Sequence, residues 1–148
     1  MHFNGSASFA ADRRHVWDVL IDPSNVGQCA PVPIVRVDDT HFRSQAKIGS
    51  GLFSATFVTN VELAELDAER HASLVAHGRG SGTTIEATTS FDLRDGETAG
   101  FTVVDWAADL ELGGMFAGPG TKIIQERAPE AIRQLVDCLR RQVEGGTP

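Results

Sequence analysis

The run from Thr121 to Gly145 carries the clearest helical pattern in the chain, because its apolar residues recur at spacings of three and four. Such spacing places them on one face of an α-helix. Pro129 lies within the run and removes one helical hydrogen bond, so the helix either breaks there or bends. We favour one bent amphipathic helix, whose apolar face comprises Ile124, Ala128, Ile132, Leu135, Val136, Leu139 and Val143.

The N-terminal part of the chain predicts one strand followed by two short helices. Residues His2 to Ala10 alternate between apolar and polar side chains, as a half-buried strand does. Asp12 is suited to cap a helix that runs to about Ile21. The Asp22-Pro23 pair ends that helix, and Pro23 fits the first turn of a second short helix.

Alternation with a period of two then dominates the chain up to the C-terminal helix. The connections are too short for parallel crossovers, so the strands are expected to pair antiparallel. Together with the helix they predict an α+β fold, in which a curved sheet of six to seven strands wraps around the helix. We expect one domain over residues 1–144 and a disordered tail over residues 145–148. The predicted strands are Ile34–Val37, His41–Ile48, Phe53–Leu63, a strand around Ala72–Ala76, Ile85–Leu93 and Phe101–Leu112.

Composition and charge narrow the classes of protein to which this chain can belong. A chain of 148 residues suits one domain with a sizeable core. A net charge of −7 argues against nucleic acid as a partner and leaves at most transient contact with an anionic membrane. No stretch reaches about 18 consecutive apolar residues and the N-terminus lacks a signal-peptide pattern, so a cytoplasmic protein is expected. Cys29 and Cys138 are far apart in the sequence, and in that compartment both are expected to be reduced.

Residue types that carry chemistry do not form a catalytic or metal-binding motif. The five histidines are scattered without metal-ligand spacing, so we expect no bound metal and no cofactor, and we nominate no catalytic residue. Asp105 and Asp109 share a strand face opposite Trp106. They form either a carboxylate pair for acid–base work or, as we favour, part of a solvent-facing surface. The glycines from Gly78 to Gly82 precede a strand, which favours a tight strand connection over a phosphate loop.

Several short motifs, spread over nearly the whole chain, together resemble one family. They are Val16-Trp17, Asp22-Pro23, Cys29-x-Pro31, Lys47-Ile48-Gly49, Gly78-x-Gly-x-Gly and Gly113-Gly114. This set is similar to the carbon monoxide dehydrogenase CoxG group of the START-like, polyketide cyclase and Bet v 1-like superfamily. The resemblance implies a helix-grip fold of the START/Bet v 1 type. It also implies a quinone or lipid as ligand and a molybdenum hydroxylase system, such as CO dehydrogenase, as partner. Val32 departs from the glycine that the family often has after its Cys-x-Pro motif.

A cavity is expected between a curved sheet and the helix that it grips, lined by the inward apolar faces of both. We therefore expect non-catalytic binding of a hydrophobic small molecule there. Of the predicted lining residues, Phe57, Phe91, Trp106 and Ile132 are expected to share one apolar volume. The full predicted site is Phe53, Phe57, Leu74, Ile85, Thr89, Phe91, Val104, Trp106, Ala108, Met115, Phe116, Ile124, Ala128 and Ile132.

Two other functions stay open at this point. A polyketide cyclase or aromatase would need polar groups inside the cavity, whereas an assembly factor would act through its surface. The partners considered are the small molecule, molybdenum hydroxylase subunits and a second copy of this chain. The glycine-rich segment from Gly113 to Gly120 is interpreted either as a mobile gate of the cavity or as a slack connection.

Overall fold

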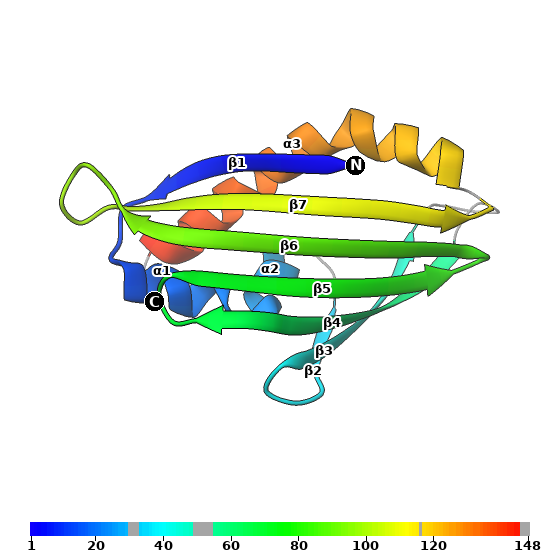
Figure 1. The fold of residues 1–148 in the computed structure, drawn as a ribbon, viewed down its shortest axis with the longest axis horizontal. Coiled ribbons are helices and arrows are strands. Elements are labelled where there is room, and N and C mark those ends of the chain that lie inside the picture. Colours follow the sequence, from blue (N-terminus) through cyan, green and yellow to red (C-terminus); the bar gives the residue numbers. More distant parts are fainter. Residues whose placement is uncertain (30–32, 49–54, 116, 146–148) are drawn as a thin grey trace.

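The protein forms one antiparallel sheet with helices on one side of it (Figure 1). The computed structural model describes residues 1–29, 33–48, 55–115 and 117–145. The seven strands form a single sheet in the order β1-β7-β6-β5-β4-β3-β2. This architecture confirms the predicted sheet of six to seven strands with two short helices and a long C-terminal helix. In chain order the elements are β1 (His2–Phe9), α1 (Arg13–Leu20), α2 (Pro23–Cys29), β2 (Ile34–Arg36), β3 (His41–Ile48), β4 (Ala55–Asp67), β5 (His71–Gly80), β6 (Thr83–Asp95), β7 (Thr102–Gly114) and α3 (Ala117–Glu144).

The β5–β6 connection is a two-residue hairpin loop. Gly80 pairs with Thr83, so only Ser81 and Gly82 lie between the two strands. Their φ angles are 49° and 75°, both in the left-handed region. Two consecutive positive φ angles are typical of a type I′ turn, whose twist matches that of the flanking strands. The glycine-rich segment therefore makes the tight strand connection that its sequence predicts.

The main core lies where α1 and the C-terminal half of α3 meet the sheet. The carboxylate of Asp12 accepts a 2.9 Å hydrogen bond from the backbone N–H of His15, which confirms the predicted N-cap of α1. Trp17 on this helix packs against Phe91 of β6, with ring centroids 6.1 Å apart. Trp17 therefore holds α1 against the sheet. The buried cluster comprises Ala7, Phe9, Val16, Trp17, Ala72, Phe91, Leu93, Val104, Leu139 and Val143.

The C-terminal helix is one continuous element of 28 residues with Pro129 inside it. The alternative of a break at Pro129 is therefore wrong. Gly145, at the start of the predicted disordered tail, donates a 2.8 Å hydrogen bond to the backbone oxygen of Arg141. The rest of that predicted tail, residues 146–148, lies outside the described residues.

The beginning of α3 corrects the interpretation of residues 113–120 as a glycine-rich loop. Gly113 and Gly114 belong to β7, and the helix starts at Ala117. Pro119 is tolerated there because N–H groups in the first turn have no helical acceptor. A Cβ atom on Gly120 would lie 3.0 Å from Cδ1 of Leu112, so glycine lets the first turn approach β7 closely.

Cys29 and Cys138 form a disulfide, which corrects the prediction that both are reduced. The bond joins α2 to α3 and brings the two Cα atoms to 5.6 Å, although the cysteines are 109 positions apart in sequence. Gln142 of α3 also donates a 3.2 Å hydrogen bond to the backbone oxygen of Asn25 in α2. The prediction failed because it rested on the expected cytosolic compartment and on the distance between the cysteines along the chain, and neither says which helices pack together.

Removal of this disulfide is expected to destabilise the fold. Cys138→Ser should lower the free energy of unfolding by about 2–5 kcal/mol, because the bond closes a long loop in the unfolded chain. Urea unfolding with and without dithiothreitol measures the effect. The reductant should destabilise the wild type and leave the variant unchanged. Two titratable thiols in unreduced, denatured wild-type protein would contradict the disulfide.

Candidate functional site

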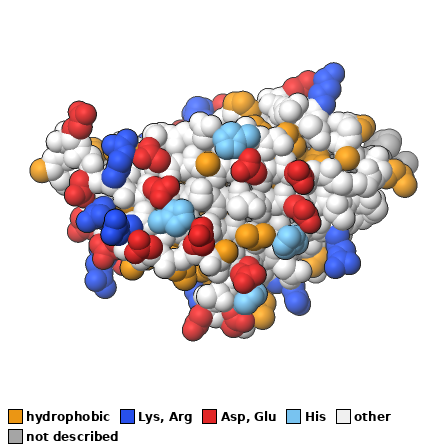
Figure 2. Space-filling view, in the orientation of Figure 1, with side chains coloured by type: hydrophobic (Ala, Val, Ile, Leu, Met, Phe, Trp, Pro, Cys, Tyr) orange, Lys and Arg blue, Asp and Glu red, His pale blue; other side chains and the backbone are white. Residues whose placement is uncertain are grey.

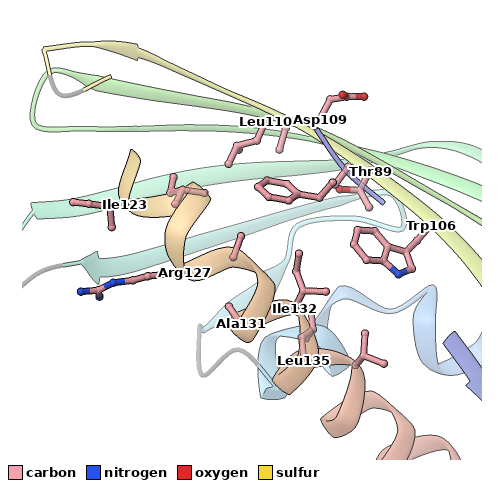
Figure 3. Close-up of a pocket in the computed structure, with 15 residues that line it drawn as sticks. Thr89, Trp106, Asp109, Leu110, Ile123, Arg127, Ala131, Ile132 and Leu135 are labelled. Carbon is pink, nitrogen blue, oxygen red and sulfur yellow. The ribbon is translucent and has the colours of Figure 1, made fainter. Parts of the chain in front are cut away.

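A pocket of about 480 Å³ lies between α3 and the strands β1, β6 and β7. Small-molecule sites commonly measure about 300–1,000 Å³. Figure 3 shows side chains from the helix and from the strands converging on this space. Most of them are apolar, so the pocket suits an apolar ligand. The lining residues are Phe3, Ala87, Thr89, Trp106, Ala108, Asp109, Leu110, Ile123, Ile124, Arg127, Ala128, Ala131, Ile132, Leu135 and Val136.

Strand register explains why the sheet residues of the pocket meet. Thr89 of β6 pairs with Ala108 of β7, and Ala87 pairs with Leu110. Side chains two positions apart on a strand point to the same face, so these four side chains and that of Trp106 lie on the face that α3 covers. The wall is therefore built from alternate residues of two neighbouring strands.

The helix supplies the opposite wall through two adjacent rows of side chains. Residues four positions apart lie above one another on an α-helix. One row runs along the predicted apolar face, and the other lies immediately beside it. The two rows are Ile124-Ala128-Ile132 and Ile123-Arg127-Ala131, with Leu135 and Val136 in the following turn.

Gly5 gives the Trp106 indole the space to lie against β1. The two residues are direct partners in the β1–β7 pair. A Cβ atom at position 5 would lie 3.0 Å from Cζ2 and 3.1 Å from Nε1 of Trp106. Heavy atoms in van der Waals contact usually lie about 3.5–4.0 Å apart, so a side chain at this position would displace the indole. Gly5 therefore helps to set the shape of the pocket wall.

Three lining residues carry polar side chains, and they point in different directions. Thr89 lies on the inner face of β6. The carboxylate of Asp109 is hydrogen-bonded to His2 at 2.8 Å, and it points away from α3 (Figure 3). Arg127 is exposed and extends from α3 away from Trp106 and from the sheet residues (Figure 3). The interior is thus mostly apolar, with charged groups at its edges.

The structure brings part of the predicted site together in this pocket. Trp106 and Ile132 share the apolar volume, as expected, but Phe91 does not line it and packs against Trp17 instead. Val104 is likewise part of the buried core. The predicted residues that do line the pocket are Thr89, Trp106, Ala108, Ile124, Ala128 and Ile132.

The remaining predicted site residues lie elsewhere. Phe57, Leu74 and Ile85 are partly buried but do not line the pocket. Met115 is 77% exposed at the end of β7. Phe53 and Phe116 fall outside the described residues. Alternation assigns a residue to the inner face, but it does not say which part of that face is filled by core and which is open.

Several lining residues were missing from the predicted site. Phe3, Ala87 and Leu110 have the inward parity that the strand pattern already contained. The helix row through Ile123 and Arg127 was missed because it borders the apolar face and contains a charged residue. Spacing of four residues from position 123 to 131 was the available signal.

The sheet face turned away from the helices carries histidines paired with carboxylates (Figure 2). Asp105 on this face accepts a 2.8 Å hydrogen bond from Arg94, and Asp109 is bonded to His2. Both aspartates therefore lie on the solvent-facing surface, as favoured from the sequence. Within the described residues, no group of three or more His, Cys, Asp or Glu side chains is placed to hold a metal ion. The pairs are His2–Asp109 (2.8 Å), His41–Asp38 (2.8 Å), His41–Glu62 (3.8 Å), His71–Asp92 (2.7 Å), His71–Glu65 (3.3 Å) and His77–Glu86 (3.6 Å).

Pairing with an opposite charge shifts the pKa values of several side chains on this face. The hydrogen bond that Asp92 accepts from His71, and next the one that Glu65 accepts, raises the pKa of His71 above its ordinary value. Asp38 raises the pKa of His41 in the same way. Arg94, followed by Ser6, lowers the pKa of Asp105. At His71 and His41 the pairing thus favours the protonated imidazole.

The chain is similar to one protein family in sequence and to several solved structures in fold. Residues 5–144 match the family described as the G subunit of carbon monoxide dehydrogenase (CoxG). No curated protein matches the chain. Among solved structures, a conserved protein from Geobacillus kaustophilus has a TM-score of 0.82 at 19% identity, over 97% of this chain and 95% of that chain.

Two further solved structures have the same fold. A START superfamily protein from Mycobacterium smegmatis has a TM-score of 0.65 at 18% identity, over 99% of both chains. The Zhui aromatase/cyclase from Streptomyces sp. R1128 has a TM-score of 0.64 at 15% identity, also over 99% of both chains. At these identities the similarity shows a START-like fold, which confirms the fold that the sequence resemblance implies.

A larger side chain at position 5 is expected to move Trp106. Gly5→Val should shift the indole N–H resonance of Trp106 and lower the free energy of unfolding by about 1–3 kcal/mol, because the new side chain overpacks the wall. Two-dimensional NMR of the indole region and urea unfolding measure the two effects. Ser8→Val on the exposed face of the same strand is the control and should change neither. An unmoved Trp106 resonance in Gly5→Val would contradict the close contact.

His71 is expected to stabilise the fold only while it is protonated. Its pKa is raised in the folded state, so its contribution is fully present below the unfolded pKa of about 6.5 and is lost as pH rises through the folded value. His71→Gln should therefore cost more stability at pH 6 than at pH 9, by less than about 1 kcal/mol at this partly exposed site. Urea unfolding at both values tests this, with Asp92→Asn as a companion that should show the same trend. A cost that is equal at the two pH values, or larger at pH 9, would contradict it.

Proposed function

The chain belongs to the CoxG family of carbon monoxide dehydrogenase, and we propose that it binds a hydrophobic small molecule between α3 and the sheet. The observation that carries the proposal is the pocket of about 480 Å³ with its mostly apolar lining. Burial of apolar ligand surface contributes roughly 25 cal/mol per Å². A pocket of this kind therefore selects for hydrophobic ligands without many directed polar contacts.

The chemistry of the lining favours binding over catalysis. A cyclase or aromatase needs groups that exchange protons with its substrate near neutral pH. The hydroxyl of Thr89, which belongs to the lining, is a hydrogen-bonding group and not an acid or base in that range. The carboxylate of Asp109 is engaged by His2 on the outer face. The aromatase/cyclase of similar fold is 15% identical to this chain, and that likeness supports the fold alone.

Family membership supports a finer proposal about ligand and partners. The ligand is a lipid or a quinone-like molecule, and the partners are subunits of a molybdenum hydroxylase such as CO dehydrogenase. In the part of the chain that the structure describes, no helix is long and apolar enough to cross a membrane. Detection of these subunits after affinity purification from the native cell would test the partnership.

The cytoplasmic location expected from the sequence is also a proposal. The Cys29–Cys138 disulfide bears directly on it, because cytosolic proteins mostly keep their thiols reduced. Alkylation of free thiols in intact cells before lysis reports the redox state in place. A fully oxidised pair in the cell would speak against a reducing compartment.

Filling the pocket is expected to abolish ligand uptake while the fold survives. Ile132→Trp places a large side chain between the two walls, at a cost of about 1–3 kcal/mol in folding free energy. Binding of the uncharged apolar dye Nile red should weaken at least about tenfold, as a pocket that no longer admits the dye predicts. Fluorescence titration measures the affinity, and thermal melting checks the fold.

Gln125→Trp is the matched control, because Gln125 is exposed on α3 and does not line the pocket. It adds the same side chain outside the pocket and should leave dye affinity unchanged. A wild-type protein that binds neither the dye nor any fatty acid or quinone would remove the binding proposal. In that case Ile132→Trp would only destabilise a packed core.

A further inference from the structure

Arg127 is the one cationic residue among the described residues that line the pocket. It occupies the middle of the helix row that also contains Ile123 and Ala131. Arg127 is exposed, and its side chain extends from α3 away from Trp106 and from the sheet residues of the pocket (Figure 3). The charge therefore lies in solvent at the edge of the pocket, where the polar end of an amphiphilic ligand would also meet the solvent.

The helix provides Arg127 with little opportunity for an ion pair of its own. The positions four residues before and after it are Ile123 and Ala131, and the position three before it is Ile124. Glu130, three residues after it, is already bonded to Arg133 and Gln134. Among the described residues, no carboxylate lies within ion-pairing distance of Arg127, whereas Arg133 and Arg140 of the same helix are both paired.

We infer that the ligand is an amphiphile with a single anionic head group, a carboxylate or phosphate, held by Arg127 at the edge of the pocket. This inference rests on the proposed function and narrows its ligand class. A guanidinium presents a planar set of N–H donors that matches two oxygens of a carboxylate or phosphate. The apolar chain then extends between the helix rows and the sheet toward Trp106.

The other role open to Arg127 is purely structural. Arginine often covers apolar surface with its methylene groups while its charge stays in water. That role predicts no dependence of ligand affinity on the charge of the ligand head group. The two roles are therefore separated by comparing ligands that share a chain and differ in the head group.

The experiment measures displacement of Nile red by three ligands with the same twelve-carbon chain: laurate, dodecyl phosphate and the uncharged dodecanol. Arg127→Gln should weaken laurate, dodecyl phosphate or both relative to dodecanol by about threefold to tenfold, as expected for one exposed charge-assisted contact. Arg127→Lys should retain part of the preference, because it keeps the charge and loses the planar donor pair. The anion that is weakened more identifies the head group.

Arg141→Gln removes a cation of the same helix that does not line the pocket and is the matched control. It should leave all three affinities unchanged. Anion binding to the wild type should also weaken more than dodecanol binding when sodium chloride rises from about 0.02 M to about 0.5 M, because salt screens an exposed charge pair.

A change of less than about threefold for both anions relative to dodecanol in Arg127→Gln would overturn the inference and leave the binding proposal intact. An equal loss in Arg141→Gln would overturn it as well, because the effect would then come from the net charge of the protein. Failure of every ligand and of the dye itself would overturn the proposed function together with this inference.

Discussion

The structure depends on how one helix is held against the sheet along only part of its length. The C-terminal half of α3 sends Leu139 and Val143 into the core, where they meet Phe9 and Trp17. The preceding turns, from Ile123 to Ile132, line the pocket, and Leu135 and Val136 border both the pocket and the core. A single helix on a curved sheet cannot be in close contact everywhere, so tight packing at one end leaves space toward the other.

The attachments of α3 are concentrated at that packed end. Near its C-terminus the backbone oxygen of Val143 is hydrogen-bonded to the ring of His15 at 2.8 Å. The carboxylate of Glu144 accepts a 2.9 Å hydrogen bond from the backbone N–H of Ala10. The Cys29–Cys138 disulfide adds a covalent link in the same half. These contacts let the first half of the helix border an open pocket without loosening the fold.

The two faces of the sheet carry different kinds of side chain. The outer face carries paired histidines and carboxylates, whereas the inner face supplies Trp106, Ala108 and Leu110 to the pocket. Gly5 affects the shape of the pocket wall, because the absence of a side chain there lets the Trp106 indole lie against β1. The charged groups near the pocket are thus kept at its edges, which suits a ligand with an apolar body and a polar end.

The sequence by itself determined the element order, the antiparallel sheet, the N-cap at Asp12 and the inward position of residues such as Thr89 and Ile132. These features follow from local rules: the periods of strands and helices, capping and turn chemistry. Only the tertiary structure decided that Phe91 belongs to the core while Trp106 borders a pocket. The strand pattern puts both side chains on the inner face, and they differ in which helix side chains pack against them, Trp17 of α1 in one case and the pocket side of α3 in the other. The tertiary structure also decided the Cys29–Cys138 pairing and the position of Arg127, since each depends on packing between elements that are distant in sequence.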